Sequence, residues 1–171
     1  MNNEFVNANN LSNIGKIILA KNQTIAVAES VTAGHMQVAF SLADNAINFF
    51  QGGITVYNIG QKVQHLSVEP VHALSCNCVS EKVAIEMAIN VCDLFLSDWG
   101  IAITGYASTV PEEGIIELFS IYAISYKSKI LSKGIIRPEN SGNPVLVRHQ
   151  YVNTLLEIFN NLLSRPEGID S

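Results

Sequence analysis

The residues best placed for chemistry follow an apolar run, Thr24 to Ala28, and form the turn Glu29-Ser30-Val31-Thr32-Ala33-Gly34. A turn from a strand into a helix lies at the carboxyl end of a sheet, where open α/β folds bind their ligands. Free backbone N–H groups at such a turn suit an anion or a developing oxyanion. Ser30 and Thr32 are therefore the first candidates for chemistry.

Two further apolar runs end in polar residues. One ends at Ile103-Thr104-Gly105, and the other ends at Val56-Tyr57-Asn58 and leads within one turn to Lys62. If all three runs are strands of one sheet, hydroxyl groups, an aromatic ring and an amine converge near Ser30.

Hydrophobic periodicity and turn residues predict the elements that carry these ends. The patterns predict helices near 10–21, 35–44, 60–66, 81–96 and 145–164, and strands at 24–28, 49–57, 99–105, 118–126 and 129–137. Residues 67–79 are expected to be irregular, and residues 106–117 a loop. Early alternation followed by a late hairpin predicts a three-layer α/β/α sandwich with a mixed sheet. The whole chain, 1–171, is expected to be one domain with its core at about 10–163 and frayed ends.

Composition narrows the class of partner. The net charge is −5 and no dense cluster of Lys and Arg exists, which argues against nucleic acid. No apolar run reaches the roughly 18 residues that span a bilayer, and the amino terminus lacks a signal-peptide pattern. Three cysteines do not suggest a disulfide framework, so a cytoplasmic protein is expected. Charged residues are only 15% of the chain, which predicts a homo-oligomer.

Four segments together form a recognisable pattern. The four segments are AESVTAG at residues 28–34, GGITVYNIGQK at 52–62, VSEKVA at 79–84 and TGYAS at 104–108. In order and spacing they resemble the CinA C-terminal family, the competence/damage-inducible protein domain known as nicotinamide-nucleotide amidase. That family shows AES-C-T-GG, GG-x-V-x-Y-x-N-x-x-K, VSEE-VA and TG-x-AGP at these places. The resemblance covers about residues 10–163.

The resemblance implies deamidation of nicotinamide mononucleotide, a small-molecule substrate, to nicotinate mononucleotide and ammonia. It implies that Ser30 is the nucleophile, Lys62 its base, and Tyr57 and Thr104 polar partners. A lysine can serve as the base when desolvation lowers its pKa, and serine–lysine pairs are a known variant of the catalytic triad. Neither a metal nor another cofactor is implied.

The expected ligand-binding positions surround these four residues. Backbone N–H groups from Thr32 to Gly34 would hold an oxyanion or a phosphate. The other expected positions are Glu29, Ala33, Gly105 and Arg148.

The chain departs from the family mostly where a phosphate would bind. Val31 replaces the family's Cys, and Ala33 replaces a Gly. The glycine-rich phosphate loop after Thr104-Gly105 is replaced by residues 108–114, which include Glu112 and Glu113. The family's Gly-Asp-Arg becomes Gly142-Asn143-Pro144, which leaves Arg148 as the nearby cation. These changes predict a divergent member whose ligand differs from the mononucleotide.

Each candidate also has a purely structural explanation. Ser30 can be a helix N-cap, Lys62 a solvated charge, and Tyr57 a half-buried strand aromatic. The Thr104 hydroxyl can bond the backbone, and Glu29 can be a buried partner for Lys62 or for a backbone amide.

The sequence also leaves open two functions other than deamidation of the mononucleotide. One is a non-catalytic domain that uses the same pocket as a small-molecule sensor or an interaction module. The other is hydrolysis of a different, uncharged amide. The spacing of His65, His72, Cys76 and Cys78 matches no usual zinc pattern, so no metal site is predicted.

Overall fold

A mixed five-stranded sheet forms the centre of the molecule. The computed structural model describes residues 5–139 and 142–165, so most of the predicted frayed ends on either side of 10–163, namely 1–4 and 166–171, lie outside the described residues. The strand order is β2-β1-β3-β4-β5, in which β1 is parallel to β2 and β3, and β4 is antiparallel to β3 and β5. The strands are β1 (Ile25–Glu29), β2 (Phe50–Thr55), β3 (Trp99–Gly105), β4 (Ser120–Tyr126) and β5 (Lys129–Ile136).

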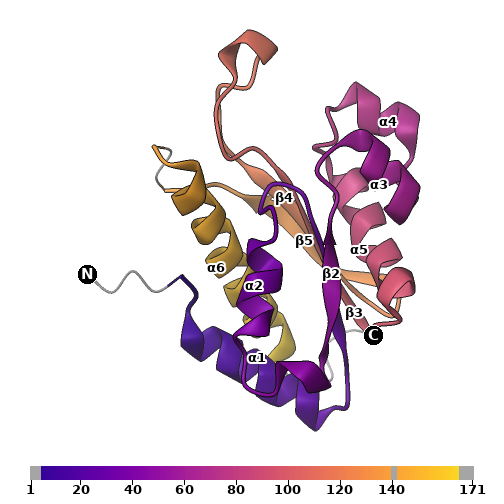
Figure 1. The fold of residues 1–171 in the computed structure, drawn as a ribbon, viewed down its shortest axis with the longest axis vertical. Helices are drawn as coiled ribbons and strands as arrows, with labels where there is room; N and C mark the ends of the chain where they lie inside the picture. Colours follow the sequence, from indigo (N-terminus) through magenta and orange to yellow (C-terminus); the bar gives the residue numbers. More distant parts are fainter. Residues whose placement is uncertain (1–4, 140–141, 166–171) are drawn as a thin grey trace.

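Helices cover both faces of this sheet (Figure 1). One face carries α1 (Ala8–Ala20), α2 (His35–Ser41) and α6 (Pro144–Leu163). The other carries α3 (Ile59–Leu66), α4 (Pro70–Ser75) and α5 (Glu81–Phe95). Short 3-10 turns, η1 (Ala46–Asn48) and η2 (Pro111–Glu113), lie in the connections. The predicted three-layer α/β/α sandwich with a mixed sheet is therefore confirmed.

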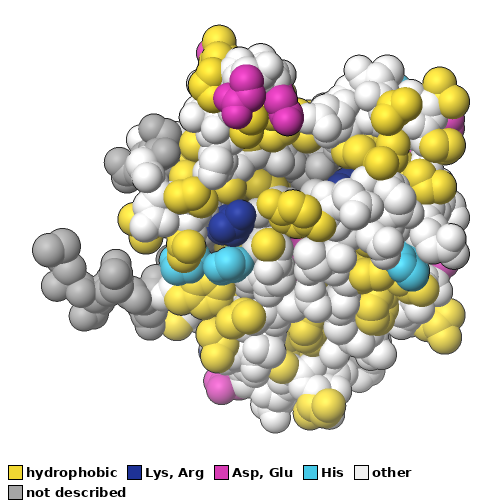
Figure 2. Space-filling model, turned by 45° about the horizontal axis from the view of Figure 1, so that its top comes forward, with side chains coloured by type: hydrophobic (Ala, Val, Ile, Leu, Met, Phe, Trp, Pro, Cys, Tyr) yellow, Lys and Arg dark blue, Asp and Glu magenta, His cyan; other side chains and the backbone are white. Residues whose placement is uncertain are grey.

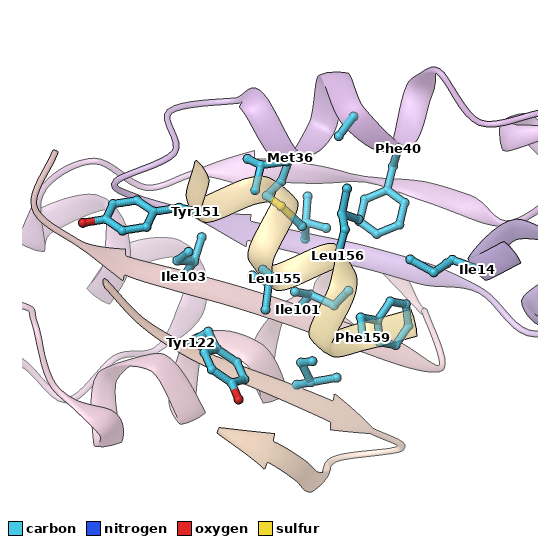
Figure 3. Close-up of a cluster of buried hydrophobic side chains, with 14 of the residues drawn as sticks. Ile14, Met36, Phe40, Ile101, Ile103, Tyr122, Tyr151, Leu155, Leu156 and Phe159 are labelled. Carbon is cyan, nitrogen blue, oxygen red and sulfur yellow. The ribbon is translucent and has the colours of Figure 1, made fainter. Parts of the chain in front are cut away.

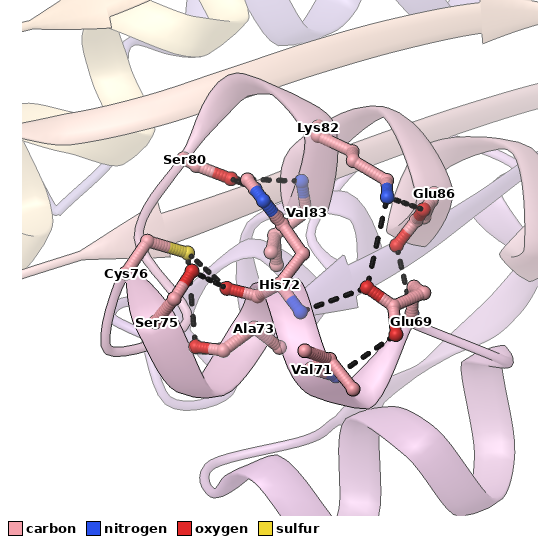
Figure 4. Close-up of polar contacts among 10 residues, drawn as sticks. All are labelled: Glu69, Val71, His72, Ala73, Ser75, Cys76, Ser80, Lys82, Val83 and Glu86. Atoms are coloured by element: carbon pink, nitrogen blue, oxygen red, sulfur yellow. Dashed lines mark hydrogen bonds and ion pairs between the residues drawn. The ribbon is translucent and has the colours of Figure 1, made fainter.

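The expectation of an irregular stretch at 67–79 was wrong, because α4 lies within it. The Glu69 carboxylate caps this helix by accepting from the N–H groups of Val71 (2.9 Å) and His72 (2.7 Å), and Pro70 occupies the first turn. Lys82 lies between Glu69 and Glu86 and links α4 to α5 (Figure 4). A helix of six residues is too short to show a periodic apolar face, so its signal was the cap rather than the hydrophobic pattern.

The glycine pair in β2, Gly52 and Gly53, lies where neighbouring groups come close to the backbone. A Cβ at Gly53 would lie 2.4 Å from a methyl of Val27 and 2.8 Å from the Gln37 side chain. The register of β1 and β2 also shifts next to Gly52, which has φ +124°. The missing side chains let β2 lie close against β1 beneath α2.

The larger core lies between the sheet and the α1, α2 and α6 layer (Figure 3). Helix α6 contributes Tyr151, Leu155, Leu156 and Phe159, all fully buried. The opposite core is built on α5, which buries Val83, Met87 and Val91 but leaves Leu94 47% exposed. Together the two cores fix the carboxyl edge of β1 and β3.

Candidate active site

The three polar strand ends meet at one edge of the sheet. A pocket of about 500 Å³ opens there. Its walls come from the turn after β1, the start of α3, the connection from α4 to α5, and the loop of residues 106–119 that projects beyond the sheet (Figure 1). Figure 2 looks onto this edge and shows a hollow between that loop, tipped with acidic side chains, and the helices opposite.

Ser30 and Lys62 are in direct contact inside this pocket. The Lys62 Nζ lies 2.9 Å from the Ser30 Oγ. It also donates to the backbone carbonyl of Val56 at 2.7 Å and more weakly to that of Tyr57 at 3.4 Å. Helix α3 begins at the Asn58 cap, directly after β2, and this cap turns the lysine back toward Ser30.

Lys62 is an unusually buried amine, with only 1% of its surface exposed. Burial lowers its pKa from the usual value near 10.5, and the nearby Cys78 thiol has a smaller opposing effect. No acidic side chain lies within ion-pairing distance of Lys62 among the described residues. The amine thus has no counter-charge to stabilise its protonated form, and its burial favours the uncharged form.

Glu29 bonds the backbone and not Lys62. It is fully buried, and its carboxylate accepts from the N–H groups of Gly34 (3.1 Å), Met36 (2.9 Å) and Gln37 (2.9 Å) and from the Thr32 hydroxyl (2.5 Å). This carboxylate therefore satisfies the first turn of α2, since Gly34 at the N-cap has no side chain to do so. Ser30 is not the cap of α2, and the Thr32 hydroxyl faces Glu29.

The backbone N–H groups of residues 32–34 were expected to bind an anion, but two of the three donate hydrogen bonds within the turn. Ala33 N–H donates to the Ser30 carbonyl, and Gly34 N–H donates to Glu29. Ala33 and Gly34 are also absent from the pocket lining, so the extra methyl of Ala33 does not intrude on a ligand. Within the described residues, the N–H groups of Val31 and Thr32 have no hydrogen-bond acceptor, and Val31 lines the pocket.

The end of β3 forms the floor of the pocket. Thr104 is 1% exposed, and its hydroxyl donates to the Cys78 carbonyl at 2.9 Å. Gly105 has φ +157°, and a Cβ there would lie 2.4 Å from the Phe119 carbonyl oxygen, so only glycine fits between β3 and β4. Both residues line the pocket, but the Thr104 hydroxyl already has a structural partner.

Tyr57 and Arg148 lie at the pocket walls. The Tyr57 side chain is 66% exposed, which is more than a half-buried strand aromatic would be. Arg148, on the first part of α6, donates from Nε to the Val31 carbonyl at 3.0 Å and so fastens the turn after β1. Its terminal nitrogens have no hydrogen-bond partner within the described residues.

Sequence reasoning missed several lining residues. Cys78 and Asn77 approach from the α4–α5 connection, and both have left-handed backbone angles. Burial raises the pKa of the Cys78 thiol, and Lys62 lowers it by a smaller amount. Glu113 reaches the pocket from η2. The capping pair Glu69-Pro70 was the signal that could have placed the α4–α5 connection against Ser30.

The residues considered for zinc have other neighbours. His72 bonds Ser80 at 2.8 Å, His65 bonds Gln61 at 3.1 Å, and the Cys76 thiol faces the His72 carbonyl (Figure 4 shows the His72 contacts). Across 5–139 and 142–165, no group of three or more His, Cys, Asp or Glu side chains is arranged to hold a metal ion.

Fold and site together define an α/β domain with a buried serine–lysine pair at the carboxyl edge of a mixed sheet. Residues 8–162 match the profile of the CinA C-terminal domain family, so the chain belongs to that family. Protein MG115 of Mycoplasma genitalium is 32% identical over 144 residues, which cover 83% of this chain and 89% of that protein. A CinA superfamily protein from Enterobacter cloacae has a similar structure, with TM-score 0.85, 25% identity and coverage of 96% of both chains.

Other relatives are longer than this chain. A CinA-like protein of Synechocystis sp. is 36% identical over 94 residues, which are 55% of this chain but only 23% of that protein. The chain thus spans about a quarter of the length of such relatives. Among the described residues, no helix combines the length and the apolar character needed to cross a bilayer.

Proposed function

We propose that this domain hydrolyses the carboxamide of nicotinamide mononucleotide, or of a related amide, with Ser30 as nucleophile and Lys62 as general base. The observation that carries the proposal is the 2.9 Å contact between Lys62 Nζ and Ser30 Oγ inside a ligand-sized pocket. A nucleophilic hydroxyl needs such an adjacent base, and the contact lies within hydrogen-bonding reach.

The two backbone carbonyls orient the lysine for this role. A neutral amine has two N–H donors and one lone pair. In the uncharged amine the carbonyls of Val56 and Tyr57 accept these two N–H groups, which leaves the lone pair for the Ser30 hydroxyl, whereas the protonated amine also donates to Ser30 Oγ. Burial lowers the pKa of Lys62, and this increases the fraction of enzyme in which the lone pair is available.

The reaction then proceeds through an acyl-enzyme. Ser30 Oγ attacks the amide carbon as its proton passes to Lys62, and the carbonyl oxygen becomes an oxyanion. The C–N bond breaks, and Lys62 returns the proton to the leaving nitrogen, which departs as ammonia. Water, deprotonated by Lys62, hydrolyses the ester to the carboxylate and frees Ser30.

The backbone N–H of Val31, with that of Thr32 beside it, is the proposed oxyanion donor. Neither group has an acceptor among the described residues, and both directly follow the nucleophile. Preorganised donors of this kind contribute about 10²–10³-fold to acyl transfer.

Ammonia release from nicotinamide mononucleotide tests the proposal. We expect turnover by the wild type and a loss of about 10³-fold or more in Ser30→Ala. Ser41→Ala is the matched control, because Ser41 lies on the exposed side of α2 and bonds only its own helix. Turnover that survives in Ser30→Ala would overturn the mechanism. Nucleotide binding without any turnover would favour the non-catalytic sensor.

A further inference from the structure

We propose that Glu113 makes this pocket select amides that carry a positively charged ring and lack a phosphate group. The proposal rests on the hydrolase function above and names its substrate class. It follows from the charges that line the pocket and from the position of Glu113 at the pocket's outer wall.

Charged side chains are few in the pocket. Those that line it are Lys62, Arg148 and Glu113. Lys62 is 1% exposed and already bonds Ser30 and two carbonyls, so it is not available to pair with a phosphate. The other two charges, on Arg148 and Glu113, are opposite in sign. The free N–H groups of the two residues that follow Ser30 are assigned to the oxyanion. A phosphate dianion would therefore meet one available cation, Arg148, and one carboxylate, Glu113, whereas phosphate sites are usually built from several cations or free N–H groups.

Glu113 differs from Glu112 in lining the pocket and from Glu117 in lacking an ion pair. Glu117 faces Arg137 at 3.5 Å and is thereby partly compensated. Glu113 has no ion-pair partner among the described residues, while its backbone N–H donates to Val110 and fixes it on η2. Its uncompensated carboxylate therefore attracts a cation at the pocket and repels an anion.

The remaining walls suit a flat cationic ring. Tyr57 and Tyr106 contribute aromatic surface, and Ile59, Leu74 and Val110 contribute aliphatic surface. A pyridinium ring gains from contact with aromatic faces and from a nearby carboxylate. Nicotinamide riboside has such a ring, the same carboxamide and no phosphate, so it is the matched probe against nicotinamide mononucleotide.

The experiment compares kcat/KM for these two substrates in the wild type, Glu113→Gln and Glu113→Lys. We expect the wild type to favour the riboside by about tenfold or more. The preference should fall about threefold in Glu113→Gln and at least tenfold in Glu113→Lys, and it should shrink at high salt. Glu112→Gln is the control, because this neighbouring carboxylate does not line the pocket.

The outcomes separate the two proposals. A wild type that favours the mononucleotide, or a preference unchanged in Glu113→Lys, overturns the role of Glu113 and leaves the hydrolase standing. If the wild type hydrolyses neither compound, the proposed hydrolysis of nicotinamide nucleotides and nucleosides is wrong, and the ratio of the two dissociation constants in the same variants then decides the selectivity. A ratio that favours the riboside and falls in Glu113→Lys supports it, and any other ratio overturns it.

Discussion

The turn after β1 and the loop after β3 leave the same edge of the sheet but are built in different ways. The turn, residues 30–34, is held by Glu29, by the Ser30 carbonyl and by Arg148. The loop, residues 106–119, projects beyond the sheet and closes on itself through one bridge, Val110 to Ile115. Within the described residues, no hydrogen bond of the turn uses a side chain of the loop.

Because of this difference, the Ser30–Lys62 contact and the outer wall of the pocket depend on different parts of the chain. The Ser30–Lys62 contact depends on the turn, α3 and the end of β2, so changes in the loop can leave it intact. The loop supplies Glu113, Val110 and Ile115 to the pocket wall and can vary without unfolding the core. The departures from the family motifs at 108–114 lie in the variable part, and Ser30 and Lys62 lie in the rigid part.

The largest effect is expected at Lys62. Replacing it with Met keeps the volume but removes the base, so kcat should fall about 10³-fold or more. Burying a cationic amine opposes folding, and its removal should leave the free energy of unfolding unchanged or raise it by up to about 2 kcal/mol. Ammonia release and urea unfolding at pH 7 measure the two effects. A strong loss of stability with activity retained would contradict both.

The pH dependence of stability and of kcat/KM in the wild type tests the same role of Lys62. Burial lowers the pKa of Lys62 in the folded state, so the folded state binds fewer protons than the unfolded state between that pKa and 10.5. Stability conferred by this group therefore rises with pH across that window, and kcat/KM rises as the amine loses its proton. Lys62→Met should lack this stability increase, and its unfolding curves from pH 7 to 10 provide the check.

The next effect is expected at Glu29, which holds the turn but does not line the pocket. Glu29→Gln turns one acceptor oxygen into a donor facing N–H groups, so the free energy of unfolding should fall by about 3 kcal/mol. Glu117→Gln is the control, since its ion pair is exposed and should change stability by less than about 1 kcal/mol. Equal losses in the two variants would show that the turn is not specially rigid.

Local patterns in the sequence predicted much of this arrangement. Buried strands at 24–28 and 99–105, the Ser80 cap and the glycine pair at 52–53 each leave a local signature. The resemblance brought Ser30 and Lys62 together, whereas periodicity alone would have left Lys62 a solvated charge. The coarse fold and the proposed pair of reacting groups were therefore available before the structure.

The other features of the site depend on contacts that no local sequence pattern encodes. Glu29 bonds residues five to eight positions ahead, and only the path of the turn shows that its partners are backbone N–H groups. The Thr104 hydroxyl meets the carbonyl of Cys78, which is 26 residues away. Glu113 reaches the pocket because the Val110–Ile115 bridge bends the loop back.

The smallest effect on stability is expected at the tip of the loop. The tip, Pro111-Glu112-Glu113-Gly114, lies between the bridged residues Val110 and Ile115, which exchange hydrogen bonds of 2.8 and 3.1 Å. Replacing these four residues with Asn-Gly gives a two-residue turn suited to an antiparallel pair. The free energy of unfolding should change by less than about 0.5 kcal/mol, because a shorter exposed loop alters closure entropy only slightly.

The same replacement should alter recognition but not chemistry. With Glu113 removed, the preference for a phosphate-free substrate should decline as in Glu113→Gln, while kcat on the preferred substrate stays within about threefold of the wild type. Steady-state kinetics with both substrates, beside urea unfolding, measure this. A fall in kcat as large as that of Lys62→Met would mean that the loop holds the reacting groups in place, and the division between a rigid turn and a variable loop would then fail.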